Sequence, residues 1–451
     1  MKVVVVGAGF AGLSAAIALQ ERRHEVLLLE RRGVLGGRAT SFRDAVTGED
    51  VDNGTHLMIG AYGATLELAR RAGAQDLLQA QDNLRIDYVD ARGFTSLSCP
   101  PLVAPLHLLA GLLGLRLPWR ARLDALRLAL AVRYGKPPHG LTLAEYFRST
   151  GQSEQTRRLL WDPLATAILN ETPERVAAIL FYSVYREAFL ASHRASRLVF
   201  LKRGWGEFHE RLARYFESRG GVLQRRALAE AVELEADCVS QVRYAKGPET
   251  PEEIRLGQLA EMRSARADAV MLATPWHAVT GLVPEAFRGH APFRDLGRLK
   301  SSPIVSIELW LDRIVVDRPM VGLRDCEVEW VFDKGRLYGR AGPPQHLAFI
   351  VSAAQRSIPR ANAELVASAE AALRRYFSAM ADAKTLRSLV LREPDATFVA
   401  DPEAESLRPG PATPIQGLYL AGDWTATGLP ATIEGAVRSG LRAAECVKPG
   451  T

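Results

Sequence analysis

The first residues whose spacing could do chemistry are three glycines near the amino terminus, at the spacing Gly-x-Gly-x-x-Gly: Gly7, Gly9 and Gly12. They follow a valine-rich run, Lys2–Val6, and precede a helical pattern over Leu13–Arg22. In such a turn the first glycine permits a tight bend, the second lets a pyrophosphate approach the backbone, and the third lets the helix pack on the strand. The start of the helix then offers free N–H groups and a positive dipole end to an anion.

A carboxylate stands where such a unit needs one. A second apolar run, Glu25–Glu30, ends eighteen positions after Gly12. A carboxylate at Glu30 can accept hydrogen bonds from ribose hydroxyls, and its charge repels a 2′-phosphate. Strand, helix, strand and acid together predict a βαβ unit that binds a dinucleotide. Three neighbouring residues are assigned to the same site: Phe10, Ala11 and Arg31.

A Gly-Gly-Arg extension, Gly36, Gly37 and Arg38, follows this unit. Two glycines let the backbone pass close to a cofactor, and an arginine can neutralise a pyrophosphate. The extension resembles that of the FAD-dependent amine oxidase and phytoene desaturase superfamily. This resemblance implies FAD rather than a nicotinamide cofactor.

Distant segments of the chain resemble the same superfamily. Asp268–Pro275 is similar to a strand and Ala-Thr-Pro turn placed near FAD, and Gly417–Ala421 is similar to a strand before a Gly-Asp pair and a helix. The resemblance implies that the pair meets the ribityl-phosphate region, and that the start of the helix lies against the flavin ring, where its dipole stabilises negative charge. A strand over Gly220–Val232 would carry an adenine contact. The residues implied are Val232, Ala273, Thr274, Gly422, Asp423, Ala431, Thr432 and Ile433.

The predicted fold class is α/β: a Rossmann-like, FAD-binding dinucleotide fold of the glutathione-reductase type with an inserted α+β substrate domain. A chain of 451 residues suits two or three domains. We expect a discontinuous FAD domain over 1–75, 200–282 and 405–451. A mostly helical, membrane-facing part would cover 76–199, and a substrate domain with mixed sheet and helix would cover 283–404. Local patterns predict strands at PIVSIELWL, EVEWVF and HLAFIVSAA, a helix over Ala361–Phe377, and an exposed loop or hairpin over Val242–Ala267.

Four further stretches narrow the resemblance: Asp52–Tyr62, Ser302–Arg313, Glu329–Gly335 and Gly422–Gly440. Together they resemble the hydroxysqualene dehydroxylase family of bacterial hopanoid synthesis. The sequence departs from that family at Thr55 and at Pro394–Asp395. The resemblance implies reductive dehydroxylation of a long isoprenoid lipid, in which flavin N5 gives hydride to an allylic carbon while the hydroxyl leaves as water. Such chemistry needs a proton source and a dry, apolar tunnel.

For the proton source we predict His56, with Asp52 four residues earlier as its orienting partner. The superfamily passes this stretch along the flavin, so the resemblance also implies cofactor contacts from Thr55, His56 and Leu57. The alternative is that His56 only hydrogen-bonds FAD or the backbone. The cysteines show neither paired spacing nor a nearby histidine at ligand spacing, so no metal is expected.

Residues 101–136 combine leucines at helical spacing with a basic bias. Basic amphipathic helices lie in membrane interfaces, and Trp119 is placed like an interfacial anchor. The alternative is an ordinary helix pair with solvated arginines. Unpaired cysteines indicate a reducing compartment, so we expect a cytoplasmic protein, peripheral on the inner face of the cell membrane. The stretch contains a single acidic residue, Asp124, and six basic ones: Arg116, Arg120, Arg122, Arg127, Arg133 and Lys136.

Other functions stay open on the same fold. A carotenoid or phytoene-type desaturase would transfer hydride from its substrate to the oxidised flavin, the reverse of the dehydroxylase. A prenyl-lipid escort protein would not be catalytic. An amine oxidase is disfavoured, because Thr432 stands where that class places an aromatic side chain. No second glycine motif follows a strand, so a separate electron donor is expected. The net charge is +6, but no basic stripe interleaved with aromatics occurs, so nucleic acid is not an expected partner.

Overall fold

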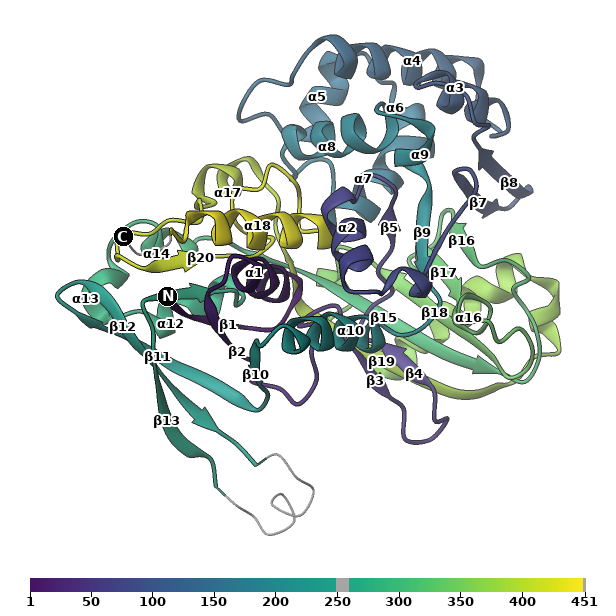
Figure 1. Ribbon diagram of the computed structural model, residues 1–451. Helices are drawn as coiled ribbons and strands as arrows, with labels where there is room; N and C mark the ends of the chain where they lie inside the picture. Colours follow the sequence, from purple (N-terminus) through teal and green to yellow (C-terminus); the bar gives the residue numbers. More distant parts are fainter. Residues whose placement is uncertain (249–258, 449–451) are drawn as a thin grey trace.

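A five-stranded parallel sheet lies on one side of the molecule, at the left of Figure 1, in the computed structural model, which describes residues 1–248 and 259–448. Its central strand is the valine run predicted from the sequence, and Val3–Val6 are all buried. Such continuous apolar runs are typical of parallel strands covered on both faces. The strand order is β10 (Val222–Gln224), β2 (Glu25–Leu29), β1 (Lys2–Val6), β14 (Ala269–Leu272) and β20 (Leu418–Leu420).

Helix α1 (Phe10–Glu21) covers one face of this sheet, flanked by α10 (Trp205–Ser218) and α18 (Ile433–Cys446) (Figure 1). The helix begins three residues earlier than predicted, because the glycine turn already has helical hydrogen bonding from Phe10 onward. Every residue of α1 from Phe10 to Leu19 is buried. A Cβ at Gly440 of α18 would lie 2.1 Å from the carbonyl oxygen of Ala11, so these two helices pack at backbone contact.

The strand predicted over Gly220–Val232 is two strands. It breaks after β10 at Arg225–Arg226, where Arg226 has a positive φ of 53°, and resumes as β11 (Ala227–Glu235). Strand β11 leaves the parallel sheet and pairs antiparallel with β12 (Cys238–Lys246), which pairs with β13 (Glu261–Arg266). The exposed hairpin predicted over Val242–Ala267 is therefore the β12–β13 ladder, with 249–258 outside the described residues.

A seven-stranded sheet forms the second large layer. The three strands predicted in it are confirmed, although EVEWVF is a strand only from Trp330. Helix α16 (Asn362–Tyr376), also predicted, packs its buried residues on one face of this sheet. All neighbours are antiparallel except β16 and β7. The order is β19 (Thr385–Phe398), β15 (Ser301–Leu311), β18 (Gln345–Val351), β17 (Trp330–Asp333), β16 (Met320–Leu323), β7 (Arg85–Asp90) and β8 (Gly93–Ser98).

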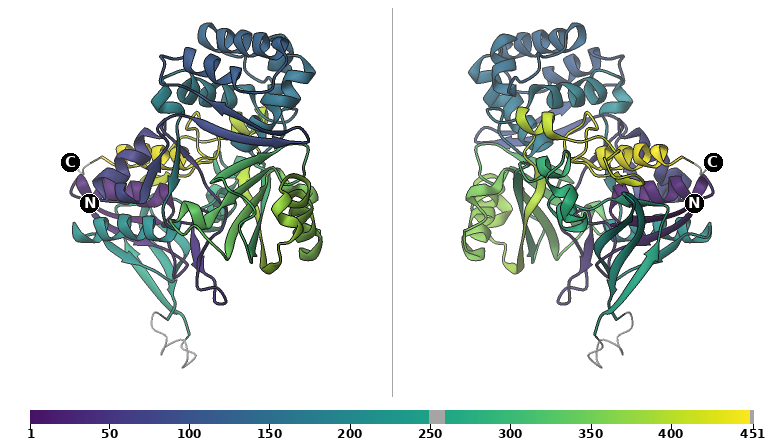
Figure 2. Two further views of the ribbon diagram at one scale, coloured as in Figure 1. Left: turned by 90° about the vertical axis from the view of Figure 1, so that its right-hand side faces the viewer. Right: turned by 90° about the vertical axis from the view of Figure 1, so that its left-hand side faces the viewer.

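A helical cap lies above both layers, at the top of each view in Figure 2. Two single π-helical turns, Arg157–Trp161 and Tyr185–Phe189, interrupt it. Within the described residues, no helix has the length and apolar character that crossing a bilayer requires. The main helices of the cap are α3 (Leu106–Leu113), α4 (Trp119–Tyr134), α5 (Leu143–Ser149), α7 (Asp162–Leu169), α8 (Ala178–Val184) and α9 (His193–Ser196).

A small antiparallel sheet separates the core around α1 from the core under the cap. It consists of β5 (Met58–Ile59), β9 (Leu198–Leu201) and β6 (Leu78–Ala80). Side chains alternate between the two faces of a strand. Val199 and Leu201 accordingly join the core around α1, whereas Leu198 and Phe200 join the core under the cap, which continues to Val4 and Leu272 of the parallel sheet. We call this sheet the partition sheet.

Candidate functional site

The carboxyl ends of the parallel strands meet at one edge of the sheet and bring distant predicted residues together. Gly7 follows β1, Glu30 follows β2, Ala273 follows β14 and Gly422 lies just after β20. Ligands of open α/β sheets bind at this edge, where the strand order reverses about the first strand. The segments recognised separately in the sequence thus form one site.

The glycine turn has the tight geometry that its spacing predicts. Gly7 has a φ of +101°, and a Cβ there would lie 2.7 Å from the carbonyl oxygen of Ala273. A Cβ at Gly12 would lie 1.8 Å from the carbonyl oxygen of Gly7. Helix α1 starts after Gly9 without a side-chain cap among the described residues. Its first N–H groups, including those of Phe10 and Ala11, are therefore free to bind an anion.

Glu30 is buried and fixed by two backbone amides. Its carboxylate accepts hydrogen bonds from Ala8 N at 2.9 Å and from Arg32 N at 2.8 Å. Arg31, between them, is exposed. The residue of β11 beside Glu30 is Ala227, whose N–H donates to the Glu30 carbonyl oxygen at 2.8 Å.

The structure does not place Val232, which was predicted to contact adenine, beside Glu30. Val232 lies five residues farther along β11, about 16 Å at ~3.3 Å per residue, where it pairs with Val242 of β12. The prediction treated Gly220–Val232 as one strand, whereas the structure has two, β10 and β11. The break at Arg225–Arg226 places the start of β11, not its middle, beside Glu30.

The Gly-Gly-Arg extension joins the two ends of the chain. Gly36 and Gly37 both have positive φ, and Gly36 N donates to Ala8 O at 3.0 Å, beside the glycine turn. The Arg38 guanidinium donates to Asp423 Oδ1 at 2.6 Å and to the carbonyl oxygen of Ala396 at 2.8 Å. The arginine expected at a pyrophosphate is thus also paired with the aspartate of the C-terminal Gly-Asp pair.

The start of α18 points from the C-terminal segment toward the same region. Ala431 and Thr432 precede the helix, Ile433 begins it, and Thr432 Oγ1 accepts a hydrogen bond from Gly435 N at 3.0 Å. The Glu434 carboxylate turns away from this helix start. It accepts hydrogen bonds from the first N–H groups of α2 (Gly63–Arg71) and so fixes α2 against α18.

Unpaired hydroxyl groups show that this site fits a polar cofactor. Thr55 Oγ1 and Thr274 Oγ1 are buried without a hydrogen-bond partner among residues 1–248 and 259–448, and both residues were assigned to the cofactor from the sequence. An unsatisfied buried hydroxyl costs about 1–3 kcal/mol, which a bound group can offset. Ser306 Oγ is a third such atom, missed by sequence reasoning. A Cβ at Gly54 would lie 3.7 Å from both Ser306 Oγ and His56 Cε1, so this hydroxyl neighbours the predicted acid.

The His56 imidazole is held by the backbone. Its Nδ1–H donates to the carbonyl oxygen of Gly54 at 2.7 Å, and its ring packs edge-on to Trp205, with centroids 6.0 Å apart. This contact leaves Nε2 as the ring atom able to accept or deliver a proton. Burial lowers the pKa of His56 below its ordinary value. The neutral imidazole is therefore the favoured form near neutrality.

Asp52 does not orient His56 directly, contrary to our prediction. Its buried carboxylate accepts hydrogen bonds from Lys334 Nζ at 2.5 Å, Tyr338 Oη at 2.5 Å and Ser41 Oγ at 2.6 Å. Burial alone would raise the pKa of Asp52, but the Lys334 charge and these hydrogen bonds hold it below its ordinary value. The negative charge of Asp52 acts on His56 only through space, by raising the pKa of the imidazole.

Lys334 and Tyr338 were missed from the sequence. They lie some 280 residues after Asp52, and a lysine that follows an apolar strand reads as a solvated turn. Lys334 is in fact 3% exposed and starts the short helix α15 (Lys334–Leu337), with Nζ 4.4 Å from the centre of the Tyr338 ring. The only signal was their position within or beside the stretch Glu329–Gly335, quoted for its family resemblance.

Comparisons with known proteins agree with this geometry. A family model described as flavin containing amine oxidoreductase matches residues 10–448. A hydroxysqualene dehydroxylase from Sinorhizobium fredii is 30% identical, over 98% of this chain and 97% of that one. A 15-cis-phytoene desaturase from Synechococcus elongatus is 27% identical, over 99% and 96% of the two chains. A crystal structure of an oxidoreductase from Methanosarcina mazei, 19% identical, superposes with a TM-score of 0.74 over 99% of this chain and all of that one.

These matches confirm three predictions made from the sequence. The resemblance to hydroxysqualene dehydroxylases is confirmed by relatives that match nearly end to end. The flavin cofactor is confirmed by the family match. The fold class, with its parallel dinucleotide-binding sheet and second α+β layer, is confirmed by that family and by the superposition.

Proposed function

The chain belongs to the flavin-containing amine oxidoreductase family, and on that premise we propose that it reductively removes the hydroxyl group of hydroxysqualene to give squalene. The observation that carries the proposal is its 30% identity, over nearly the full length, to hydroxysqualene dehydroxylases. The reaction replaces an allylic C–O bond by a C–H bond and releases water. It would place the protein in bacterial squalene and hopanoid synthesis.

Four parts of the chain would hold FAD. Glu30 would bind the ribose, the start of α1 the pyrophosphate, and Arg38 with Asp423 the phosphate and ribityl region. The unpaired Thr55 and Thr274 hydroxyls would receive hydrogen bonds from, or donate them to, the same cofactor. When bound, FAD supplies the hydride that the new C–H bond requires.

His56 is the proton donor in this proposal. Its Nδ1–H is committed to Gly54 O, so the proton for the departing hydroxyl would be carried on Nε2. Burial lowers the pKa of His56, so the protonated imidazole is the minor form near neutral pH. Its fraction grows as the pH falls. Turnover should therefore rise from pH 8 toward pH 6 in the wild type and lose this dependence in His56→Gln, with kcat reduced about 10²–10⁴-fold.

The test is a single-turnover experiment. The purified protein would be reduced anaerobically until its flavin bands bleach, and hydroxysqualene would then be added. One equivalent of squalene with return of the oxidised bands is the expected result. If hydroxysqualene does not reoxidise the reduced flavin, the dehydroxylase function is rejected, whereas the conclusion that the protein is a flavoprotein stands.

A phytoene-type desaturase is the second candidate, because phytoene desaturases match the chain at 27% identity over nearly its whole length. It would run the redox chemistry in the opposite direction on a similar hydrocarbon. Oxidised protein incubated with phytoene and a soluble electron acceptor would then form new conjugated double bonds. In either case we propose a separate electron-transfer partner, and rapid bleaching of the flavin by NADPH alone would contradict this.

We further propose that the surface of α3 and α4 docks on an anionic bilayer. Its exposed apolar side chains are Leu102, Val103, Leu106, Leu113, Trp119, Leu123, Leu130 and Tyr134, with Val103, Leu113, Trp119 and Tyr134 at 68–83% exposure. On α4, Trp119, Leu123, Leu130 and Tyr134 recur at helical spacing and therefore lie on one face of that helix. An aqueous surface seldom carries so many large apolar side chains side by side.

The charges of this surface match an anionic membrane. Arg116, Arg120 and Arg133 are exposed in the same stretch, as is Arg127, which also pairs with Asp124 at 3.2 Å. The one acid of residues 101–136, Asp124, points inward, where Ser153 Oγ and Thr156 Oγ1 each donate to it at 2.7 Å. Each cation near anionic lipid contributes about 1 kcal/mol to binding. A peripheral site on the inner face of the cell membrane would suit a substrate dissolved in the bilayer.

Vesicle sedimentation tests this docking. The wild type should sediment with phosphatidylglycerol-containing vesicles at low salt, and Leu113→Ser with Trp119→Ser should lose most of that binding. Leu386→Ser is the matched control, since Leu386 is 60% exposed on β19, far along the sheet from the cap. Equal recovery of the wild type with and without vesicles would reject the membrane proposal.

A further inference from the structure

Strand β15 presents Ser306 to the segment that carries the predicted acid. Its neighbours along the strand, Val305 and Ile307, pack in the core around α16. Side chains alternate between the two faces of a strand, so Ser306 lies on the opposite face. Trp310, four residues farther on that face, donates its Nε1–H to Glu49 Oε2 at 3.0 Å. This face of β15 therefore lies against the segment that runs from Glu49 to the predicted acid.

The neighbours of Ser306 across the sheet are apolar. Ser306 pairs with Ile350 of β18 on one side and with Leu391 of β19 on the other. Opposite residues of antiparallel strands point to the same face. Ile350 belongs to the core under the cap. A single hydroxyl group thus lies between two hydrocarbon side chains, which suits a ligand that carries one hydroxyl group on a hydrocarbon.

The Ser306 hydroxyl also neighbours the imidazole of the predicted acid. A Cβ at Gly54 would lie 3.7 Å from Ser306 Oγ and 3.7 Å from His56 Cε1, so both groups flank the same backbone position. His56 Nδ1 is hydrogen-bonded to the carbonyl oxygen of Gly54 at 2.7 Å. Because Cε1 is bonded directly to Nε2, the nitrogen that can deliver a proton lies close to the same position.

The Ser306 hydroxyl is buried and unpaired. The residue is 1% exposed, and its Oγ has no hydrogen-bond partner in the described part of the chain. Ser302, equally buried on the same strand, instead donates its hydroxyl to the carbonyl oxygen of Asn170 at 2.6 Å. Buried hydroxyl groups are nearly always paired in this way. An unpaired one beside a candidate catalytic group indicates a place for a ligand.

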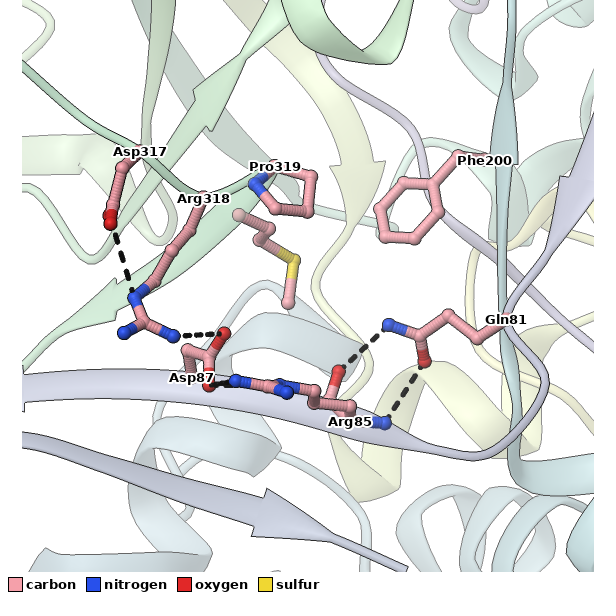
Figure 3. A pocket seen from close by; sticks show the side chains of 8 residues that line it. Gln81, Arg85, Asp87, Phe200, Asp317, Arg318 and Pro319 are labelled. Atoms are coloured by element: carbon pink, nitrogen blue, oxygen red, sulfur yellow. Dashed lines mark hydrogen bonds and ion pairs between the residues drawn. The ribbon is translucent and has the colours of Figure 1, made fainter.

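The groove between the partition sheet and β16 offers the opposite arrangement (Figure 3). There the Asp87 carboxylate accepts hydrogen bonds from Arg85 at 3.2 Å and from Arg318 at 3.1 Å. The Gln81 side chain and the Arg85 backbone exchange two further hydrogen bonds, of 2.9 and 3.0 Å. These groups bind one another and hold the walls of the groove together. Ser306 Oγ is not committed in this way and is available to a ligand.

We propose that Ser306 Oγ forms a hydrogen bond with the hydroxyl group of an allylic alcohol and holds that group beside His56. The proposal rests on the function proposed above and adds the residue that recognises the group to be removed. Ser306 belongs to the seven-stranded sheet of the second layer. Thr55 and Thr274, the other unpaired hydroxyl groups of the site, belong to segments assigned to the cofactor.

This contact distinguishes the substrate from the product. A serine hydroxyl donates one hydrogen bond and accepts two, so an alcohol satisfies it and a hydrocarbon does not. In the proposed reaction a C–H bond replaces the C–O bond, and the oxygen leaves as water with the proton from His56, while Ser306 keeps its own proton. Squalene then leaves the Ser306 hydroxyl unpaired, so the site binds hydroxysqualene in preference to squalene.

Binding to the oxidised holoprotein tests this contact without turnover. Hydroxysqualene and squalene, in the same detergent micelles, would be titrated against the flavin absorbance bands of the wild type and of Ser306→Ala. The Kd of squalene divided by that of hydroxysqualene should fall about tenfold in the variant, equivalent to about 1.4 kcal/mol, at unchanged flavin content. Ser306→Ala should melt no lower than the wild type, because it removes a buried hydroxyl group that has no partner in the described residues.

Ser302→Ala is the matched control on the same strand. It removes the hydrogen bond to Asn170, so it should lower the melting temperature and leave the ratio of the two Kd values unchanged. A ratio within twofold of the wild type in Ser306→Ala would overturn the proposal. A loss of flavin with an unchanged ratio would overturn it too, because the hydroxyl group would then serve the cofactor.

The proposed function can fail separately from this contact. If the wild type converts hydroxysqualene in a single turnover but the ratio of Kd values does not depend on Ser306, the contact is rejected and the function stands. If the ratio falls in Ser306→Ala but no squalene is formed, the dehydroxylation is rejected and Ser306 remains a binding residue for an alcohol.

Discussion

The buried pair of Lys334 and Asp52 makes a sharp prediction about stability. Both side chains are 3% exposed, and Lys334 Nζ lies 2.5 Å from the Asp52 carboxylate. Lys334→Met keeps a long apolar side chain but removes the charge, leaving a carboxylate that is buried with only neutral donors. Breaking a buried ion pair in this way costs about 3–5 kcal/mol. We expect that loss in the free energy of unfolding at pH 7.5, measured by urea titration of the FAD-saturated protein.

The loss should depend on pH in a defined direction. In the wild type the pKa of Asp52 is lowered by folding, so its contribution is present above the ordinary value of 3.8 and is lost as the pH falls below it. In Lys334→Met, burial is no longer opposed by a cation, so the pKa of Asp52 should lie above 3.8 and stability should fall as the pH rises from there. The difference between the two proteins should therefore be larger at pH 8 than at pH 5.

The double variant Asp52→Asn with Lys334→Met is the control, because it buries no charge. It should recover most of the loss and come within about 2 kcal/mol of the wild type. A Lys334→Met protein within 1 kcal/mol of the wild type, or a loss that is the same at pH 5 and pH 8, would refute the view that Lys334 compensates a buried charge.

Three further outcomes follow from single contacts. Glu30→Gln should weaken FAD binding about tenfold, seen as lower flavin content after dialysis, because it replaces charge-assisted acceptors. Gly12→Ala should abolish flavin binding and lower the melting temperature, since its Cβ would lie 1.8 Å from a carbonyl oxygen. Burial raises the pKa of Glu329 to about 7, so its contribution to stability is present below the ordinary 4.5 and is lost as the pH rises through 7. Glu329→Gln should thus be more stable than the wild type at pH 8 by about 3 kcal/mol in urea unfolding, but not at pH 4.5.

The dinucleotide-binding edge could be predicted because its signals are local. The valine run of β1, the glycine turn and Glu30 lie within thirty residues, and each has a backbone or ribose role that few other residue types can fill. The strands ending at Leu272 and Leu420 could be added because each reads as an apolar strand followed by a short polar turn. Parallel strands then carry these turns to one edge of the sheet whatever the intervening sequence.

The surroundings of His56 could not be predicted, because they depend on pairing between distant segments. Asp52 and His56 are four residues apart, which suggested a direct pair, yet the carboxylate turns toward Lys334 and Tyr338 of the second layer. The β7–β8 hairpin likewise joins the seven-stranded sheet across more than 200 residues of sequence. Such contacts are decided by how layers pack, and side-chain type along the chain carries little information about that.

The two faces of the partition sheet have a consequence for how such proteins diversify. Leu198 and Phe200 pack in the core that lies under the cap and continues to Val4 and Leu272 of the parallel sheet, while Val199 and Leu201 pack in the core around α1. Substitutions at alternate positions of one short strand can therefore change the packing of one core while the side chains that pack in the other stay the same. Related proteins could thus vary every second residue of β9, toward the cap, and keep the residues that pack against α1.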